Sequence, residues 1–338
     1  MANKPKAGFI DENNYFRREI LMFKLFDEMP GNEGPSPWRT KAYIHSENIL
    51  VLPDLAVEGY KNHPFQKSFD KIHVLVTISS LARFHAACAN YIAKKSSENP
   101  YNLLDEYGHI MAEPTFKESP WLRAGAKLTK NFLKFFSTKW NECPKNLLEQ
   151  LDELYLMGCD TLKDYDGTLN VVIHKDLWAN NILFKYQGDV PINAVLIDFQ
   201  CMRYGPPAFD VMVLLYLTTS RRFRDSYENE ILDYYYTVFS KNMADETKLE
   251  DYNREVFFHW CEKARLFAII EAALIYPFVM MDPIAAQSYF DNPDTFMDYM
   301  EVDRSYPVIE YAKENSAYRN KLLEIYEELV EKYILGRN

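Results

Sequence analysis

Apolar residues recur with helical spacing near the start of the chain. In residues 14–29 (NYFRREILMFKLFDEM), Ile20 and Phe23 fall on one face with other apolar residues, and charged residues lie between them. Pro30 marks the predicted end of this helix. Residues 38–55 then place apolar runs on either side of the turn sequence HSEN, which predicts two short strands followed by a connector.

Helical spacing dominates most of the remaining sequence. A long helix is predicted from a cap at Ser68 to about Lys95, and two further helical patterns cover residues 116–138 and 145–165. From about residue 207 to the end, almost every segment has helical periodicity. The pattern therefore predicts a small mixed segment, several helices, a short β element and a long helical remainder.

The most apolar run of the chain extends from Leu266 to Met281. It is shorter than a membrane span and contains Glu271 and Pro277, so we interpret it as a buried helix of a large helical domain. A buried Glu271 would need a partner, which the sequence does not identify.

The β element between these helical regions predicts a cluster of polar side chains. The runs VVIHKDLWANNILFKY (171–186) and VPINAVLIDFQ are separated by the short turn QGD, which is typical of a hairpin. In an antiparallel pair the start of the first strand and the end of the second lie at the same end. Asn181 starts the first strand, Asp198 ends the second, and Asp176 directly precedes the hairpin. We therefore expect these three side chains to lie together.

Two carboxylates and one amide form an oxygen ligand set that suits Mg²⁺ better than zinc or copper. Phosphoryl transfer from ATP requires such a set, with one carboxylate to accept the proton of the attacking hydroxyl and other oxygens to hold metal ions. The kinase pattern H-x-D-x-x-x-x-N followed by D-F-x is present as His174, Asp176 and Asn181, then Asp198 and Phe199. The alternative is a β-hairpin with polar, capped ends and no catalytic role.

The segments IHKDLWANNILF, AVLIDFQ and GPPAFDVMVLLY resemble the ecdysteroid-kinase-like family. That family is a branch of the choline-kinase and aminoglycoside-phosphotransferase group. The resemblance covers nearly the whole chain, but it is specific only over residues 170–215. It implies an α+β, protein-kinase-like fold with a large helical C-lobe. It also implies ATP-dependent phosphorylation of a hydroxyl group on a small molecule, such as an ecdysteroid or another lipophilic alcohol.

The same resemblance assigns roles to individual residues. It implies that Asp176 is the catalytic base and that Asn181 and Asp198 bind the cofactors Mg²⁺ and ATP. Lys175 stands where the family usually has Gly. Either the loop differs locally, because Gly permits backbone angles that Lys does not, or the position has ordinary angles that any residue adopts.

Three further polar residues have structural interpretations. His174 is expected to brace its loop by hydrogen bonds rather than to transfer protons. Asp210, at the start of a predicted helix, should pair with free N–H groups there. It should also support the catalytic loop, which is the segment 174–181 that carries Asp176. His85 lies in an apolar helical pattern and is expected to be a core histidine with satisfied hydrogen bonds.

The N-terminal segment is too short for a complete kinase-like N-lobe. In that fold a Gly-rich hairpin and a lysine on the third strand precede a helix whose glutamate pairs with the lysine. Glu19 is the matching glutamate, but only about a dozen residues precede its helix, and three strands of roughly five residues each cannot fit. We therefore predict a truncated N-lobe over residues 1–55 that lacks the Gly-rich loop and the third-strand lysine, and a helical C-lobe over residues 56–338 with its catalytic hairpin at 170–200.

The resemblance implies that the segment LVLPDL is the hinge of the kinase-like fold. The family often has Glu where this chain has Pro53, and proline has no N–H to donate. If that N–H served adenine, a hydrogen bond is lost; if the neighbours Leu52 and Asp54 serve it, nothing changes. We predict that Leu52, Asp54 and Glu19 contribute to the cofactor site.

Composition excludes some classes of function but does not identify the substrate. The chain of 338 residues carries a formal net charge of −11 and no basic stripe, which argues against a nucleic-acid surface. Five scattered cysteines and an N-terminus without an apolar leader predict a cytoplasmic protein with no membrane segment, and no obligate protein partner is evident. Two hypotheses follow: a small-molecule kinase impaired by truncation, or a pseudokinase or small-molecule-binding module. A helical interaction protein with a fortuitous motif is a third, weaker hypothesis.

Overall fold

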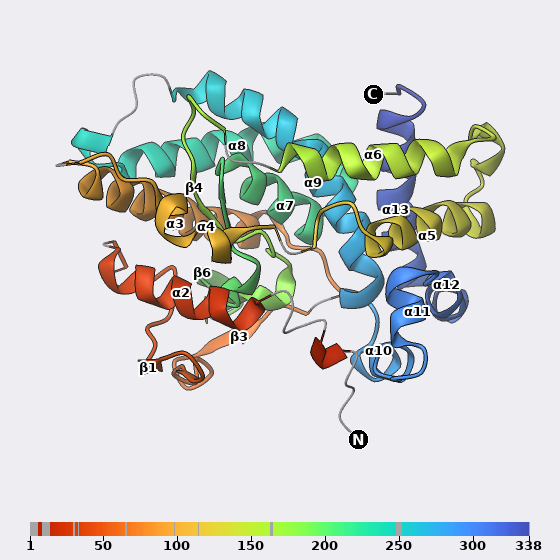
Figure 1. The fold of residues 1–338 in the computed structure, drawn as a ribbon, viewed down its shortest axis with the longest axis horizontal. Coiled ribbons are helices and arrows are strands. Elements are labelled where there is room, and N and C mark those ends of the chain that lie inside the picture. Colours follow the sequence, from red (N-terminus) through yellow and green to blue (C-terminus); the bar gives the residue numbers. More distant parts are fainter. Residues whose placement is uncertain are drawn as a thin grey trace. The chain divides into compact units, whose positions relative to one another are not determined.

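The computed structural model describes residues 6–8, 14–29, 31–32, 34–64, 66–97, 99–113, 115–162, 165–247 and 252–337. Pro30, the predicted end of the first helix, lies outside these residues. The chain divides into two compact units, which are described separately below. Unit 1 comprises residues 1–13, 113–162 and 266–338, and unit 2 comprises residues 14–112 and 163–265 (Figure 1).

In the part of the chain that the structure describes, all strands and five complete α-helices belong to unit 2. The helices are α2 (Tyr15–Glu28), α3 (Lys71–Lys95), α4 (Leu103–Met111), α7 (Ala208–Thr218) and α8 (Arg221–Asn242). The predicted helix over residues 14–29 is confirmed. The predicted cap of α3 was wrong, because Asp70 and not Ser68 precedes the helix and accepts hydrogen bonds from the N–H groups of Ile72 and His73.

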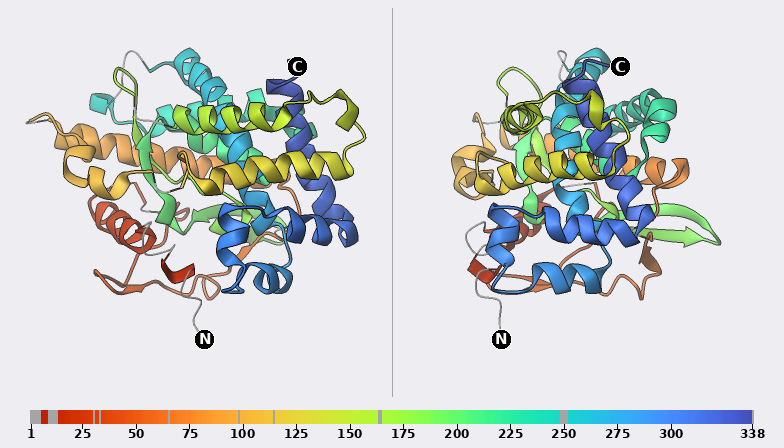
Figure 2. Two further views of the ribbon diagram at one scale, coloured as in Figure 1. Left: turned by 45° about the vertical axis from the view of Figure 1, so that its right-hand side comes forward. Right: turned by 90° about the vertical axis from the view of Figure 1, so that its right-hand side faces the viewer.

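Seven short strands form three small antiparallel sheets in unit 2. The first pairs β1 (Ile44–His45) with β2 (Leu50–Val51), around the predicted HSEN turn. The second has the order β3-β5-β6, from Tyr60–Asn62, Ile182–Gln187 and Val190–Leu196. The third pairs β4 (Val171–Ile173) with β7 (Arg203–Gly205). The predicted hairpin is confirmed as β5–β6, which the right-hand view of Figure 2 shows as two adjacent arrows.

An aromatic cluster attaches α2 to the rest of unit 2. The ring of Phe26 lies 4.9 Å from that of Phe199 and 5.3 Å from that of Trp38. Phe84 on α3 packs against both partners, with ring centroids 5.5 Å from Phe199 and 5.1 Å from Trp38. All four side chains are buried. Phe199 follows Asp198 directly, so this cluster fixes the position of Asp198 relative to α2.

Unit 1 is helical in its described residues. It contains α5 (Pro120–Phe136), α6 (Leu147–Thr161), α10 (Pro283–Phe290), α11 (Phe296–Glu301), α12 (Ser305–Glu314) and α13 (Ser316–Tyr333). The part of α9 (Arg254–Val279) from Leu266 onward also belongs to it. Two glycines allow close packing there, because a Cβ on Gly125 would lie 2.2 Å from Leu274 Cδ2 and one on Gly158 would lie 2.3 Å from Ile270 Cδ1.

The helical character predicted for the long C-terminal region is confirmed, and its most apolar run forms the buried second half of α9. Helix α3 is long and apolar enough to cross a membrane, but 72% of its most apolar window is buried inside the structure. The division into two compact units does not follow the predicted lobe boundary, because residues on both sides of position 55 belong to unit 2. The lobes at 1–55 and 56–338 remain a functional prediction.

Candidate active site

The hairpin brings its polar ends together as predicted. Ile182 pairs with Leu196, and beyond this pair the Ile197 N–H donates to the Asn181 carbonyl at 3.0 Å. Asn181 closes the short helix η2 (Ala179–Asn181), and Asp198 precedes η3 (Phe199–Cys201). Antiparallel pairing therefore places the two residues side by side at the open end of the hairpin.

Asn181 holds the catalytic loop through its side chain. Its Nδ2 donates to the Asp176 carbonyl oxygen at 2.8 Å and to Asp176 Oδ2 at 3.0 Å. Because Nδ2 donates both bonds, the orientation of the amide is fixed and Oδ1 takes part in neither of them. In the described part of the chain no donor bonds to that oxygen. Asn181 thus positions Asp176 while keeping an oxygen for another ligand.

Three carboxyl groups share this region, and burial is the main reason that the pKa of each is raised. Burial first, and then the nearby Asp198 charge, raises the pKa of Asp176 from 3.8 to about 7. The same two causes, in the same order, raise the pKa of Glu19 from 4.5 to about 7. Burial also raises the pKa of Asp198, against the effects of His174 and of a hydrogen bond from the Gln200 N–H. Neighbouring buried carboxyl groups with raised pKa values are typical of functional sites.

Glu19 reaches the site from α2 without a lysine. Its carboxylate accepts a hydrogen bond from the Phe199 N–H, and no lysine of the described chain pairs with it. The preceding residue, Arg18, is buried and donates from Nη1 to the Met202 carbonyl at 3.1 Å and from Nη2 to the Ala112 carbonyl. Helix α2 is therefore tied to both ends of η3.

His174 braces the loop, as predicted. Its Nε2 donates to the Ile197 carbonyl at 2.8 Å, and its Nδ1 accepts from the Asp176 N–H at 3.2 Å. The ring lies 4.5 Å from that of Phe199. Burial lowers the pKa of His174, which agrees with a neutral imidazole that donates at one nitrogen and accepts at the other.

Asp210 supports the catalytic loop, but not in the way that its helix position indicated. Its carboxylate accepts from the His174 N–H at 2.6 Å and from the Lys175 N–H at 2.8 Å, instead of capping α7. His85 Nε2 lies 3.1 Å from Asp210 Oδ2, and His85 Nδ1 lies 2.7 Å from the hydroxyl of Tyr235. Asp210, His85 and Tyr235 are fully buried. The prediction of a satisfied core histidine is confirmed, and its partner is the residue that holds the loop.

The backbone of Lys175 excludes one of the two alternatives for its position. Its φ is +64°, so the residue adopts the left-handed conformation that glycine enters freely, and the alternative of ordinary angles was wrong. This conformation costs a residue with a Cβ about 1–2 kcal/mol. The side chain is only 1% exposed, and its charge lowers the pKa of Asp176 against the effects of burial and Asp198. A buried cation therefore accompanies the carboxyl groups.

The donor set fits Mg²⁺. Asp198 offers a carboxylate and Asn181 an amide oxygen, and Mg²⁺ commonly binds one or two protein oxygens and completes its coordination with water and phosphate. Within the described ranges no group of three or more His, Cys, Asp or Glu side chains could hold a metal, so a site made of protein ligands alone is not present there. A cation on Asp198 would also offset the charge that contributes, after burial, to the raised pKa values of Asp176 and Glu19.

The predicted hinge residues lie apart from these contacts. Leu52 and Pro53 are partly buried, and Asp54 is exposed. The Asp54 carboxylate accepts from the Ala56 N–H at 3.0 Å and so caps the turn that follows. In the region that the structure describes, no hydrogen bond or ion pair connects Leu52 or Asp54 with Asp176, Asn181 or Asp198. Their role toward adenine stays a prediction.

Sequence reasoning missed two contributors to the site. Tyr235 lies far along the chain in a helical pattern, and nothing in its local sequence indicates a partner for His85. The left-handed Lys175 could have been found, because the residue replaces a glycine at a position where backbone angles matter.

Comparisons with known proteins agree with the motif. The chain is 25% identical over 234 residues to the uncharacterized kinase-like protein D1044.1 of Caenorhabditis elegans, a match that covers 67% of this chain and 57% of the relative. The match thus spans little more than half the length of that curated protein.

Solved structures with similar folds include two kinases and a kinase-family protein. The Plasmodium vivax ethanolamine kinase Pv091845 is 15% identical with a TM-score of 0.42, covering 92% of this chain and 73% of that one. The choline/ethanolamine kinase family protein from Mesorhizobium loti is 10% identical with a TM-score of 0.36, covering 92% and 83%. The amicoumacin kinase hAmiN, solved with AMP-PNP, Ca²⁺ and Ami, is 14% identical with a TM-score of 0.40, covering 94% and 81%.

The family match rests on most of the sequence. The model of the ecdysteroid kinase-like family matches residues 1–247, which include the catalytic loop, the hairpin and Asp210. This match and the arrangement of the hairpin agree with the α+β, protein-kinase-like fold predicted from the motif. The chain belongs to the ecdysteroid kinase-like family.

Proposed function

We propose that this protein is an ATP-dependent phosphotransferase that acts on a hydroxyl group of a small molecule, with Mg²⁺ as cofactor. The observation that carries the proposal is the contact between Asn181 and Asp176 beside Asp198. Asn181 orients Asp176, and the side chains proposed to hold a metal and to accept a proton come together at one end of a hairpin.

Each residue has a distinct task in this proposal. Asp176 accepts the proton of the attacking hydroxyl, and its raised pKa of about 7 suits proton transfer near neutral pH. Asn181 and Asp198 would hold Mg²⁺, which supplies positive charge to the phosphates when it is bound. Leu52 and Asp54 would lie on the adenine side, and Glu19 would support the cofactor site from α2. A lipophilic alcohol such as an ecdysteroid is the proposed substrate class, and the cytoplasm is the proposed location.

We further propose that turnover is slow in this chain. In kinase-like sites a lysine paired with the helix glutamate positions the phosphates, and positioning supplies much of the rate. Glu19 has no such partner in the described chain and instead accepts the Phe199 N–H. The second candidate function, a pseudokinase or small-molecule-binding module, rests on this same contact.

The two functions are separated by one experiment. ADP release from Mg·ATP would be measured with a panel of lipophilic alcohols for the wild type, for Asp176→Asn and for the control Asp189→Asn, which changes an exposed aspartate in the β5–β6 turn. We expect Asp176→Asn to lower turnover by at least roughly 10²-fold, the usual contribution of a general base, and the control to leave it unchanged. Equal turnover in all three forms would exclude Asp176 as the base. Binding of Mg·ATP or of an alcohol without any turnover would establish the binding module instead.

A further inference from the structure

Gln200, in the turn η3, holds the carboxylate of Asp198 through its side chain. Its Nε2 donates to Asp198 Oδ2 at 3.3 Å, and in the part of the chain that the structure describes this is the one hydrogen bond of the Gln200 side chain. The Gln200 N–H donates to the same carboxylate, a bond that any side chain at this position would keep. Asn181 engages Asp176 in the same way, with an amide nitrogen on one carboxylate oxygen.

The two carboxylate oxygens of Asp198 therefore have different surroundings. Oδ2 accepts from the side-chain amide of Gln200, whereas Oδ1 has no side-chain donor among the residues that the structure describes. Asp198 adopts the left-handed conformation, with a φ of +64°, directly before η3. Oδ1 is thus the oxygen that the side chains of this turn leave for another ligand.

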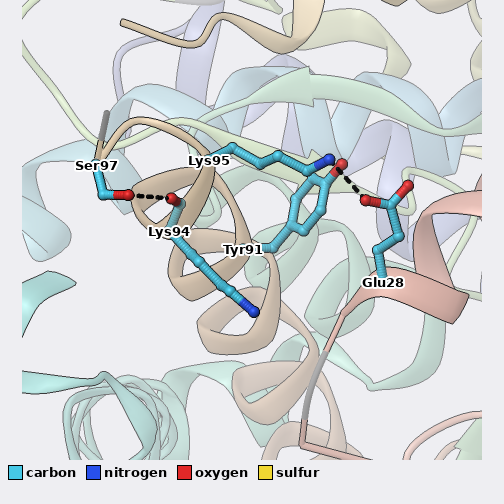
Figure 3. A pocket seen from close by; sticks show the side chains of 5 residues that line it. All are labelled: Glu28, Tyr91, Lys94, Lys95 and Ser97. Carbon is cyan, nitrogen blue, oxygen red and sulfur yellow. Dashed lines mark hydrogen bonds and ion pairs between the residues drawn. The ribbon is translucent and has the colours of Figure 1, made fainter. Parts of the chain in front are cut away.

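The turn η3 is held in place by packing that does not involve the side chain at position 200. The buried ring of Phe199 lies 4.9 Å from that of Phe26 on α2. Helix α2 is also tied to α3 by the ion pair between Glu28 Oε2 and Lys95 Nζ at 2.7 Å, which Figure 3 shows among the side chains that line a pocket. A substitution at position 200 should therefore change how the carboxylate of Asp198 is held, without moving the turn.

Mg²⁺ and Ca²⁺ both prefer oxygen ligands, but they use a carboxylate differently. Mg²⁺ requires near-ideal octahedral geometry and keeps several waters beside one or two carboxylates. Ca²⁺ takes about six to eight oxygens in flexible geometry and accepts both oxygens of one carboxylate. A carboxylate with one oxygen bonded to an amide suits Mg²⁺, and it withholds from Ca²⁺ the second oxygen that this larger ion can use.

We propose that Gln200 is a positioning residue that shifts the preference of the site at Asp198 and Asn181 toward Mg²⁺ over Ca²⁺. Its amide competes with a metal ion for Oδ2 and leaves Oδ1 to the cation. The inference rests on the proposed function, because it concerns the metal site of the proposed phosphotransferase. A purely structural role of Gln200 would change the stability of the protein but not its preference between two metals.

Calorimetry on the full chain measures the affinities for Mg²⁺ and for Ca²⁺, each added alone, so that the readout does not depend on turnover. Gln200→Met keeps the length of the side chain and removes the donor. We expect it to shift the ratio of the two affinities toward Ca²⁺ by roughly tenfold, the effect of one hydrogen bond to a charged group. Gln200→Glu should shift the ratio in the same direction, because a carboxylate cannot donate to Oδ2. The control Gln187→Met changes an exposed glutamine at the other end of the same hairpin and should keep the wild-type ratio.

An unchanged ratio in a folded Gln200→Met or Gln200→Glu protein would overturn the inference, as would an equal shift in Gln187→Met. The circular dichroism spectrum and melting temperature of each variant show whether it is folded, and either variant at position 200 is sufficient for the test. A wild type that binds neither metal would overturn both this inference and the proposed metal site. A wild type that shows the expected ratios but no turnover would count against the proposed function and leave the role of Gln200 standing.

Discussion

Replacing Asp210 by Asn should detach the catalytic loop from its buried support. The carboxylate accepts the N–H groups of His174 and Lys175 at 2.6 and 2.8 Å, and His85 Nε2 lies 3.1 Å from its Oδ2. An amide of the same shape has only one oxygen. In either orientation its NH₂ group therefore faces at least one of the two N–H groups that the carboxylate accepts.

The expected loss follows from counting these bonds. The better orientation keeps the oxygen on His174 and His85 and places the NH₂ against the Lys175 N–H. One hydrogen bond to a charged acceptor then disappears, at about 1.5–3 kcal/mol, and a buried donor is left unpaired, at about 1–3 kcal/mol. We expect Asp210→Asn to lower the free energy of unfolding by about 3–5 kcal/mol. Tyr235→Phe removes only the 2.7 Å bond to His85, and it should cost about 1 kcal/mol.

Urea denaturation followed by circular dichroism measures these differences, and the slope of the transition shows whether the unfolded state has changed. Asp225→Asn, a change of an exposed aspartate on α8, is the control and should stay within about 0.5 kcal/mol of the wild type. An Asp210→Asn protein as stable as this control would refute the inference that the carboxylate holds the loop. A Tyr235→Phe protein less stable than Asp210→Asn would refute the order of the network.

Three further predictions concern backbone, packing and charge. At Lys175, where φ is +64°, the Gly variant should be more stable than the Ala variant by about 0.5–1 kcal/mol in the same denaturation assay, and equal stabilities would contradict the left-handed conformation. Gly158→Ala should lower the free energy of unfolding by about 1–3 kcal/mol, because its Cβ would lie 2.3 Å from Ile270 Cδ1. The control Gly108→Ala, whose Cβ meets nothing closer than 3.7 Å, should not lower it. Similar melting temperatures of the two variants would argue against tight packing at Gly158. The pKa values of Glu19 and Asp176 are raised to about 7, so the folded protein binds more protons than the unfolded chain from about pH 4.5 to 7. In the absence of divalent cations, the stability that these two groups contribute is therefore present at low pH and is lost as the pH rises through 7. Glu19→Gln should make the free energy of unfolding fall less steeply with pH over this range. A wild type whose free energy of unfolding rises over the same range more steeply than that of Glu19→Gln would contradict the raised pKa values.

The local organisation of the site could be predicted because it depends on neighbours in the sequence. A hairpin brings its two ends together whatever surrounds it, so the spacing of Asp176, Asn181 and Asp198 was enough to place them side by side. The helix from Tyr15 to Glu28 could be predicted for a similar reason, because its apolar period and its end lie within one short segment.

Other predictions failed where two local solutions compete. Ser68 and Asp70 are both acceptable helix caps, and only the observed hydrogen bonds to Ile72 and His73 distinguish them. Asp210 lies in the first turn of α7, where capping its own helix is a reasonable expectation, yet two N–H groups of the catalytic loop compete successfully for its carboxylate.

The sequence by itself thus determined the helix over residues 14–29, the helical C-terminal region, the hairpin and the family motif, because all of these are encoded over short stretches of chain. The tertiary structure alone decided the left-handed conformation of Lys175, the engagement of Glu19 by the Phe199 N–H, and the network from Asp210 through His85 to Tyr235. The last two features join residues between 125 and 180 positions apart, as with Asp210 to His85 and Glu19 to Phe199. Such contacts form only when distant elements pack together and exclude water, so no local pattern records them.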